Sequence, residues 1–114
     1  MLSARNRMTR STDFDATVRR GRKAVQPDLV IYMRRATGDP KLGLIVSRSV
    51  GSAVQRHGLS RRLRHAARDI LVDLNQSEHI VIRALPSSRD VPSARLGEEL
   101  RAGLRRIEAA GAKR

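Results

Sequence analysis

The sequence lacks cysteine and tryptophan, and its 114 residues include one phenylalanine and one tyrosine. Without cysteine, disulfide frameworks, thiolate zinc sites and cysteine nucleophiles are excluded. The chain has no apolar run near the roughly 20 residues of a membrane-spanning helix, and its first ten residues have no stretch typical of a signal peptide. We therefore expect a soluble, cytoplasmic protein with a single domain over residues 1–114.

Acidic residues are also missing from the middle of the chain, since none lies between Asp39 and Asp69. The segment 46–68 contains six arginines and a glycine-containing turn that leads into a helix-like pattern. A solvated helix face normally mixes both signs of charge, as the segment 98–108 does. The acid-free segment therefore predicts a surface that faces a polyanion, and we interpret that polyanion as RNA.

The overall composition supports an anionic partner. The net charge is +13, and arginine outnumbers lysine 21 to 3. So much positive charge repels itself in a compact chain unless an anion binds to it. A guanidinium group is a planar donor fork that matches phosphate oxygens and stacks on bases, whereas an ammonium group is a point charge.

Residue patterns in the first half of the chain predict one helix followed by two strands. Residues 1–10 form a basic arm, and a short helix begins near Ser11 and ends at Gly21. Alternating apolar residues predict strands over 29–35 and 41–48. The turn residues between these strands favour a hairpin.

The second half predicts a basic helix over 53–75, a strand over 79–85, and a last helix that begins at Ser93, with residues 112–114 frayed. Gly58 costs the basic helix about 1 kcal/mol relative to alanine, so we expect an irregular first turn. The fold class is α/β, an α+β sandwich of order α-β-β-α-β-α in which a small central sheet packs against helices.

This order and the residues that carry it resemble the bacterial ribonuclease P protein component. The matching residues are Asn6, Arg7, Met8, Asp13, Phe14, Gly21, Val30, Ile31, Tyr32, Gly43 to Arg48, Val50, Gly51, Ala53, Val54, Arg56 and Arg61 to Arg64. The family signature is an Arg-Asn-Arg core followed two residues later by Lys-Arg. Here those positions hold Arg56, His57 and Gly58, and then Ser60 and Arg61.

The resemblance implies a role in tRNA processing, as the protein subunit of a ribonucleoprotein endonuclease that removes the 5′ leader from precursor tRNA. It implies that the large RNA performs the hydrolysis, with magnesium held mainly by that RNA. It also implies that the protein binds this RNA through the basic helix and the leader through a cleft between the sheet and the first helix. For the fold it implies a left-handed β-α-β crossover, against the general handedness rule.

Two groups of site residues follow. Predicted contacts to the RNA subunit are Arg48, Ser52, Arg56, His57, Ser60, Arg61, Arg62, Arg64, His65 and Arg68. Predicted leader contacts are Asn6, Arg7, Phe14, Val18, Tyr32 and Arg34. Tyr32 shares a strand face with Arg34, which favours an exposed ring, whereas for Phe14 both core packing and base stacking stay open.

We predict no catalytic residue, metal site or cofactor in the chain itself. A metal-dependent nuclease needs clustered carboxylates, and Asp13 and Asp15 stand at a helix start, where capping explains them better. His79 is expected to have a structural role at a strand edge. The expected partners are the catalytic RNA and precursor tRNA, with no membrane and no DNA specificity.

Two alternatives stay open at this point. One is a different basic RNA-binding module, such as a ribosomal protein of similar fold, which would leave precursor cleavage unchanged. The other is an autonomous nuclease, which would cleave RNA without a partner.

Overall fold

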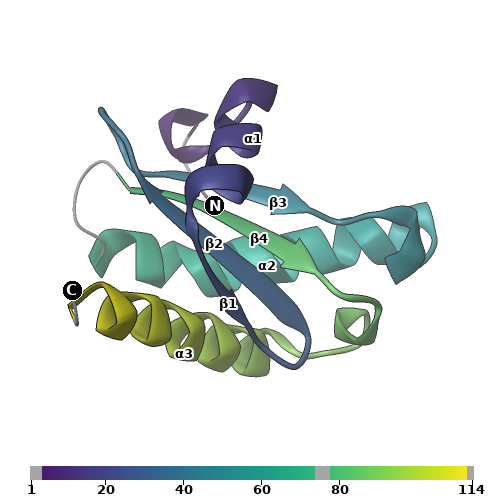
Figure 1. The fold of residues 1–114 in the computed structure, drawn as a ribbon. Helices are drawn as coiled ribbons and strands as arrows, with labels where there is room; N and C mark the ends of the chain where they lie inside the picture. The colour runs from purple at the N-terminus through teal and green to yellow at the C-terminus, as the bar shows by residue number, and fades with distance from the viewer. Residues whose placement is uncertain (1–3, 74–77, 113–114) are drawn as a thin grey trace.

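The structure, a computed structural model, describes residues 4–73 and 78–112 as a four-stranded sheet with helices on both faces (Figure 1). Helix α1 lies on one face, and helices α2 and α3 lie side by side on the other. The elements are α1 (Ser11–Arg20), β1 (Arg22–Val25), β2 (Leu29–Arg35), β3 (Lys41–Ile45), α2 (Ala53–Asp73), β4 (Glu78–Ala84) and α3 (Ser93–Ala112). Short 3-10 turns are η1 (Ala4–Asn6), η2 (Arg48–Val50) and η3 (Pro86–Ser88).

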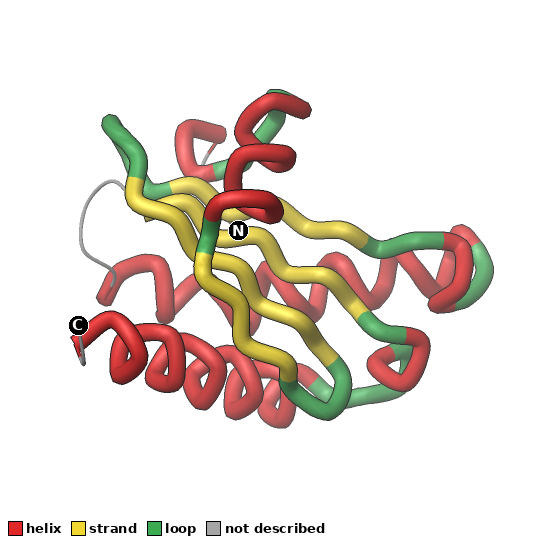
Figure 2. Tube along the Cα trace, viewed as in Figure 1, coloured by secondary structure: helices red, strands yellow, loops and turns green. Residues whose placement is uncertain are grey.

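The strands follow the order β1-β2-β4-β3 across the sheet (Figure 2). Strand β4 pairs antiparallel with β2 and parallel with β3, so the predicted hairpin between residues 29–35 and 41–48 is wrong. The apolar residues of β4 are buried on both faces, which suits a central position better than an edge. His79 accordingly lies in a central strand and not at the predicted strand edge.

The predicted order of elements is confirmed, with one strand added. Strand β1 pairs antiparallel with β2, and Ala24 is its single buried residue. So short a segment with one inward side chain has no alternation that sequence reasoning can detect. The parallel unit β3-α2-β4 is the expected β-α-β crossover, and its left-handedness stays an expectation from the family resemblance.

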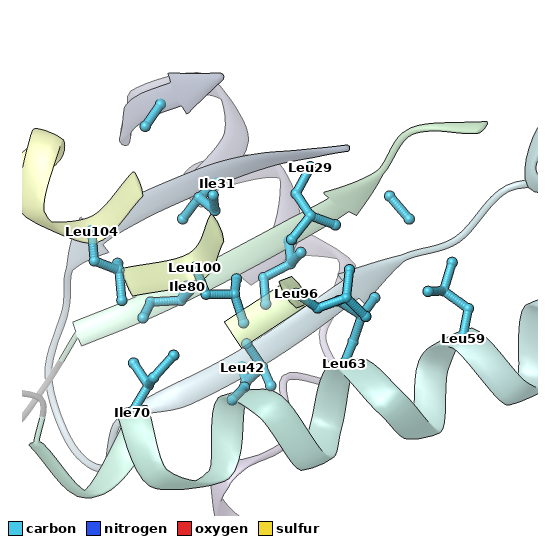
Figure 3. Packing of buried hydrophobic residues seen from close by; sticks show 14 of the residues in the cluster. Leu29, Ile31, Leu42, Leu59, Leu63, Ile70, Ile80, Leu96, Leu100 and Leu104 are labelled. Carbon is cyan, nitrogen blue, oxygen red and sulfur yellow. The ribbon is translucent and has the colours of Figure 1, made fainter. Parts of the chain in front are cut away.

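The main core lies between the sheet and the pair α2 and α3 (Figure 3). Ile31, Leu42 and Ile80 of the strands face Leu63 of α2 and Leu100 of α3. Burying such side chains contributes about 1.5–3 kcal/mol each. This packing fixes which side of α2 faces outward.

A smaller cluster lies between the sheet and α1, formed by Met8, Val30, Tyr32 and Val81 with Phe14 and Val18 packed against it. Gly43 of β3 lies directly beneath the Phe14 ring, and a Cβ atom at this position would collide with it. The glycine therefore allows α1 to approach the sheet closely.

Within the predicted basic arm, residues 4–8 are docked onto the sheet. The amide of Met8 donates to the carbonyl of Leu42 over 2.8 Å, and the Asn6 side-chain amide donates to the carbonyl of Pro40 over 2.8 Å. Met8 is buried. Residues 4–8 thus extend the edge at β3.

Helix boundaries agree closely with the sequence pattern. Gly21 ends α1 as predicted, since its amide donates to the carbonyl of Thr17 over 2.9 Å. No side chain caps the start of α1, where Arg10 occupies the N-cap position, so the predicted capping role of Asp13 and Asp15 is wrong. Helix α2 continues through Gly58 without a break. The predicted end of the basic helix, at residues 74–75, lies outside the described residues. The same is true of residues 113–114, which are part of the predicted frayed terminus.

A buried pair of carboxyl groups joins the turn after β1 to α3. The amide of Asp28 donates to Oε1 of Glu99 over 2.8 Å, and the two residues are 6% and 7% exposed. Burial, together with the side-chain hydrogen bond with Asp28, raises the pKa of Glu99 to about 7. The same hydrogen bond lowers the pKa of Asp28. Below pH 7 the pair therefore holds a proton on Glu99, beside the ionised Asp28 carboxylate.

This pair predicts a pH-dependent stability. Because the pKa of Glu99 is raised to about 7 from 4.5, its protonated form stabilises the folded chain at low pH. That contribution is lost as pH rises from 4.5 through 7. Glu99→Gln keeps a donor towards Asp28 without a charge, so urea unfolding at pH 8 should show a more stable variant with a flatter pH profile between 5 and 8. Glu98→Gln, at the exposed neighbouring position, is the control. Equal profiles for wild type and Glu99→Gln would contradict the prediction.

Candidate RNA interface

Helix α2 presents a basic face to solvent. Leu59, Leu63 and Ala67 are buried against the sheet, while the exposed stripe carries His57, Arg61, His65 and Arg68. Arg64 is half-buried beside this stripe, and Arg48 is exposed in the turn before the helix. We call these six basic residues the α2 surface. The predicted basic helix is confirmed, and it has one apolar side and one basic side.

The first turn of α2 is held by a reciprocal cap. The Ser52 hydroxyl accepts from the amide of Gln55 over 3.2 Å, and Oε1 of Gln55 accepts from the amide of Ser52 over 2.8 Å. This capping box satisfies two donors that a helix start leaves unpaired. Ser52 therefore has a structural role, and its predicted RNA contact stays a prediction.

Arg62 is half-buried, and its side chain is hydrogen-bonded to the loop before α3. Its Nε donates to the carbonyl of Val91 over 3.1 Å, and its Nη2 donates to the carbonyl of Arg89. These bonds tie α2 to the loop before α3. Arg62 can therefore contact RNA only through the N–H groups that these two bonds do not use, and this contact stays a prediction. Arg61, one position earlier, is exposed.

Arg89 is a basic residue beside the α2 surface that sequence reasoning missed. Its Cδ lies 3.1 Å from the point where a Cβ of Gly51 would stand, so it borders the turn before α2. The guanidinium group is exposed and pairs with Asp90 over 3.6 Å. No local pattern could have identified it, because the contact joins turns far apart in the sequence.

The two remaining predicted contacts on α2, Arg56 and Ser60, have less access to solvent. Arg56 is half-buried and its Nε has no hydrogen-bond partner, and Ser60 is half-buried. A Cβ at Gly58 would find open space, with Nη1 of Arg62 nearest at 3.7 Å. Packing therefore does not require glycine where the family has arginine.

The other predicted site lies on the α1 side of the sheet, where strand register defines three rows of side chains. One row is Val25, Val30, Arg83 and Ile45; the next is Lys23, Tyr32, Val81 and Gly43; the third is Arg34, His79 and Lys41. Helix α1 crosses the sheet over the middle row, because Phe14 lies on Gly43 and the cluster beneath it contains Tyr32 and Val81 (Figure 1). The helix thus separates the first row from the third.

The prediction of an exposed Tyr32 ring is wrong. The residue is 6% exposed, because Met8 and α1 cover it. The alternation correctly placed Tyr32 and Arg34 on one strand face, but it could not show that a helix covers that face. The guanidinium carbon of Arg83 lies 5.7 Å from the centre of the Tyr32 ring, a cation–π distance.

The first row and its borders form a partly apolar surface, which we call the open face: Val25, Val30, Ile45, Arg83 and Leu85, flanked by Phe14 and Val18. Val25 is 53% exposed, and Phe14 and Val18 are half-buried. Phe14 thus packs on the sheet and keeps part of its ring accessible. Of the predicted leader contacts, Asn6 and Arg7 lie instead at the edge of β3, and Arg34 lies beyond α1.

Within residues 4–73 and 78–112, no group of three or more metal-ligating side chains comes together. No helix in this described part is long and apolar enough to cross a membrane.

The fold and the two surfaces define a small, strongly basic α+β protein. The family model described as Ribonuclease P matches residues 2–108, and the chain belongs to this family. It is 58% identical over 120 residues to the ribonuclease P protein component of Mycobacterium ulcerans and 57% identical over 116 residues to that of Mycobacterium tuberculosis, with all of each chain covered. Its role is therefore that of the protein subunit of the tRNA-processing ribonucleoprotein.

Solved structures show the same fold. The RNase P protein of Staphylococcus aureus superposes with a TM-score of 0.76 at 20% identity, covering 88% of this chain and 93% of that one. The protein of Thermotoga maritima gives a TM-score of 0.74 at 23% identity, covering 92% and 97%.

Replacing glycine by alanine at two positions in the long helices should have opposite effects on the free energy of unfolding. Gly58→Ala should raise the free energy of unfolding by up to about 1 kcal/mol, because the site is open and alanine favours helix. Gly103→Ala in α3 should lower it, because the new Cβ would lie 2.6 Å from Cδ1 of Ile31. Urea denaturation of both variants provides the measurement. A loss of stability in Gly58→Ala would show that glycine is needed at this position.

Proposed function

We propose that this subunit docks onto the catalytic RNA of ribonuclease P through the α2 surface and holds the 5′ leader of precursor tRNA on the open face. The acid-free α2 surface is the observation that carries the proposal. The RNA hydrolyses the phosphodiester bond, and the protein raises the affinity for precursor over mature tRNA.

The α2 surface suits a folded RNA. Its exposed arginines and histidines follow one side of a straight helix, and the sequence places no carboxylate among them. Each arginine that meets a phosphate releases counterions, so binding strengthens as salt falls. Arg89 enlarges the surface at the end where Arg48 lies.

The open face suits single-stranded nucleotides. Unstacked bases pack on apolar side chains, aromatic rings and guanidinium planes. Phe14 and Val25 supply apolar contact, and Arg83 supplies a guanidinium held over Tyr32. Tyr32 then acts as a support beneath Arg83 and not as a stacking platform.

We assign hydrolysis to the RNA because carboxylates of the described residues pair with each other or with arginines. Asp28 and Glu99 pair with each other in a buried position, and Asp69 and Asp90 lie beside arginines. Within the described part of the chain these carboxylates do not gather into a metal-binding cluster. We expect the magnesium ions to be held mainly by the RNA.

Reconstitution tests the function directly. Leader removal from precursor tRNA is measured at low magnesium with the RNA of a mycobacterial relative alone, with the protein alone, and with both. We expect cleavage by the RNA to increase when the protein is added, and no cleavage by the protein alone. If the protein leaves the cleavage rate of the RNA unchanged, the chain is a general RNA-binding module. If the protein cleaves the precursor without the RNA, it is an autonomous nuclease.

Substitutions of two neighbouring arginines on α2 should have different effects, one on RNA binding and the other on stability. Arg61→Gln should leave stability unchanged and reduce the dependence of log affinity for the catalytic RNA on log salt by about 0.7 to 0.9 for one lost phosphate contact. Arg62→Gln should lower the free energy of unfolding by roughly 1–3 kcal/mol, because two loop carbonyls lose a charged donor. Arg105→Gln, exposed on α3, is the control for charge. An Arg61→Gln slope equal to wild type would remove Arg61 from the interface.

A further inference from the structure

A polar recess lies on the side of α1 opposite to the open face. It has a volume of about 660 Å³ and is lined by Thr9, Arg10, Asp13, Arg34, Ala36, Thr37, Lys41 and His79. These residues come from the start of α1, the third row of the sheet and the loop after β2. The volume is within the range of small-ligand sites.

The charges that line the recess are mostly positive. Three permanent cations, Arg10, Arg34 and Lys41, face one carboxylate, that of Asp13. The recess also lies at the N-terminus of α1, where the helix dipole adds positive potential and no side chain caps the backbone. An anion is therefore the favoured occupant.

His79 gives a second and independent indication. The residue is 4% exposed, and its Nδ1 lies 3.4 Å from Nη2 of Arg34. A guanidinium group has donors only, so Nδ1 must accept, and the proton of the neutral ring is on Nε2. Nε2 is buried without a hydrogen-bond partner, as is Nε of Arg34. Buried donors without acceptors cost free energy, which an oxygen-rich ligand in the recess would recover once the two side chains turn towards it.

The surroundings of His79 set the pKa of its ring. Burial lowers the pKa of His79, and the charges of Arg34 and Lys41 lower it further, while Asp13 acts in the opposite direction. A bound anion would favour the protonated ring and raise this pKa.

We propose that this recess is a phosphate-binding site separate from the two surfaces described above. Among its lining residues, the three cations and His79 recognise phosphate oxygens, and no aromatic side chain other than His79 is present for a base to stack on. The site therefore recognises the phosphate group and not the base. Both a free phosphate and a phosphodiester of an RNA chain carry this chemistry.

The site is tested on the full-length protein by following the imidazole nitrogens of His79 by NMR. Inorganic phosphate, and separately a short single-stranded RNA, are titrated at constant ionic strength adjusted with chloride. We expect the His79 signals to shift with saturation and the pKa of His79 to rise. A shift with phosphate assigns the site to the free ion, and a shift with RNA alone assigns it to the phosphodiester.

Variants distinguish binding of an anion in the recess from the general attraction of anions to a basic protein. Arg10→Gln, at an exposed position, and Lys41→Gln should each weaken the binding seen at His79 by roughly tenfold, the loss expected for one charged hydrogen bond. Arg105→Gln on the opposite side of the sheet should leave it unchanged, and circular dichroism verifies that each variant is folded. Unmoved His79 signals with both ligands, or equal affinities in all variants, would overturn the proposal. Neither result depends on the cleavage assay with the catalytic RNA, so the two proposals can fail separately.

Discussion

Strand β4 is the constraint on which the rest of the structure depends. It pairs on both sides, with β2 and with β3, and its side chains alternate between the two apolar clusters. Ile80 and Ile82 hold α2 and α3 on one face, while Val81 lies under α1 on the other. Because a strand has a period of two, this single segment fixes the positions of all three helices.

The position of α2 follows from that packing. Leu59 and Leu63 pack the helix against the sheet. Residues on the opposite side of the helix must therefore point outward. The positive charges on that side repel one another, and the apolar contacts on the other side offset this cost. Arg62 lies at the boundary and is used to hold the loop before α3, which leaves Arg61 and its exposed neighbours available to a partner.

Helix α1 has a comparable effect on the opposite face. By covering Tyr32 and Val81 it divides one continuous sheet surface into two chemically different parts. The open face is partly apolar with a single guanidinium over an aromatic ring, whereas the recess is lined by cations and one carboxylate. Gly43 makes this division possible, since a larger residue would push the Phe14 ring and its helix away from the sheet.

The sequence by itself determined the helices, three of the four strands and the basic side of α2, because periodicity and charge are local properties. The family resemblance added the function. The tertiary structure alone decided the order of the strands, the cover over Tyr32, the inward role of Arg62 and the contribution of Arg89. Each of these depends on contacts between residues far apart in the chain. Alternation shows that two faces of a strand differ, but which neighbour covers each face is set by the packing of the whole domain.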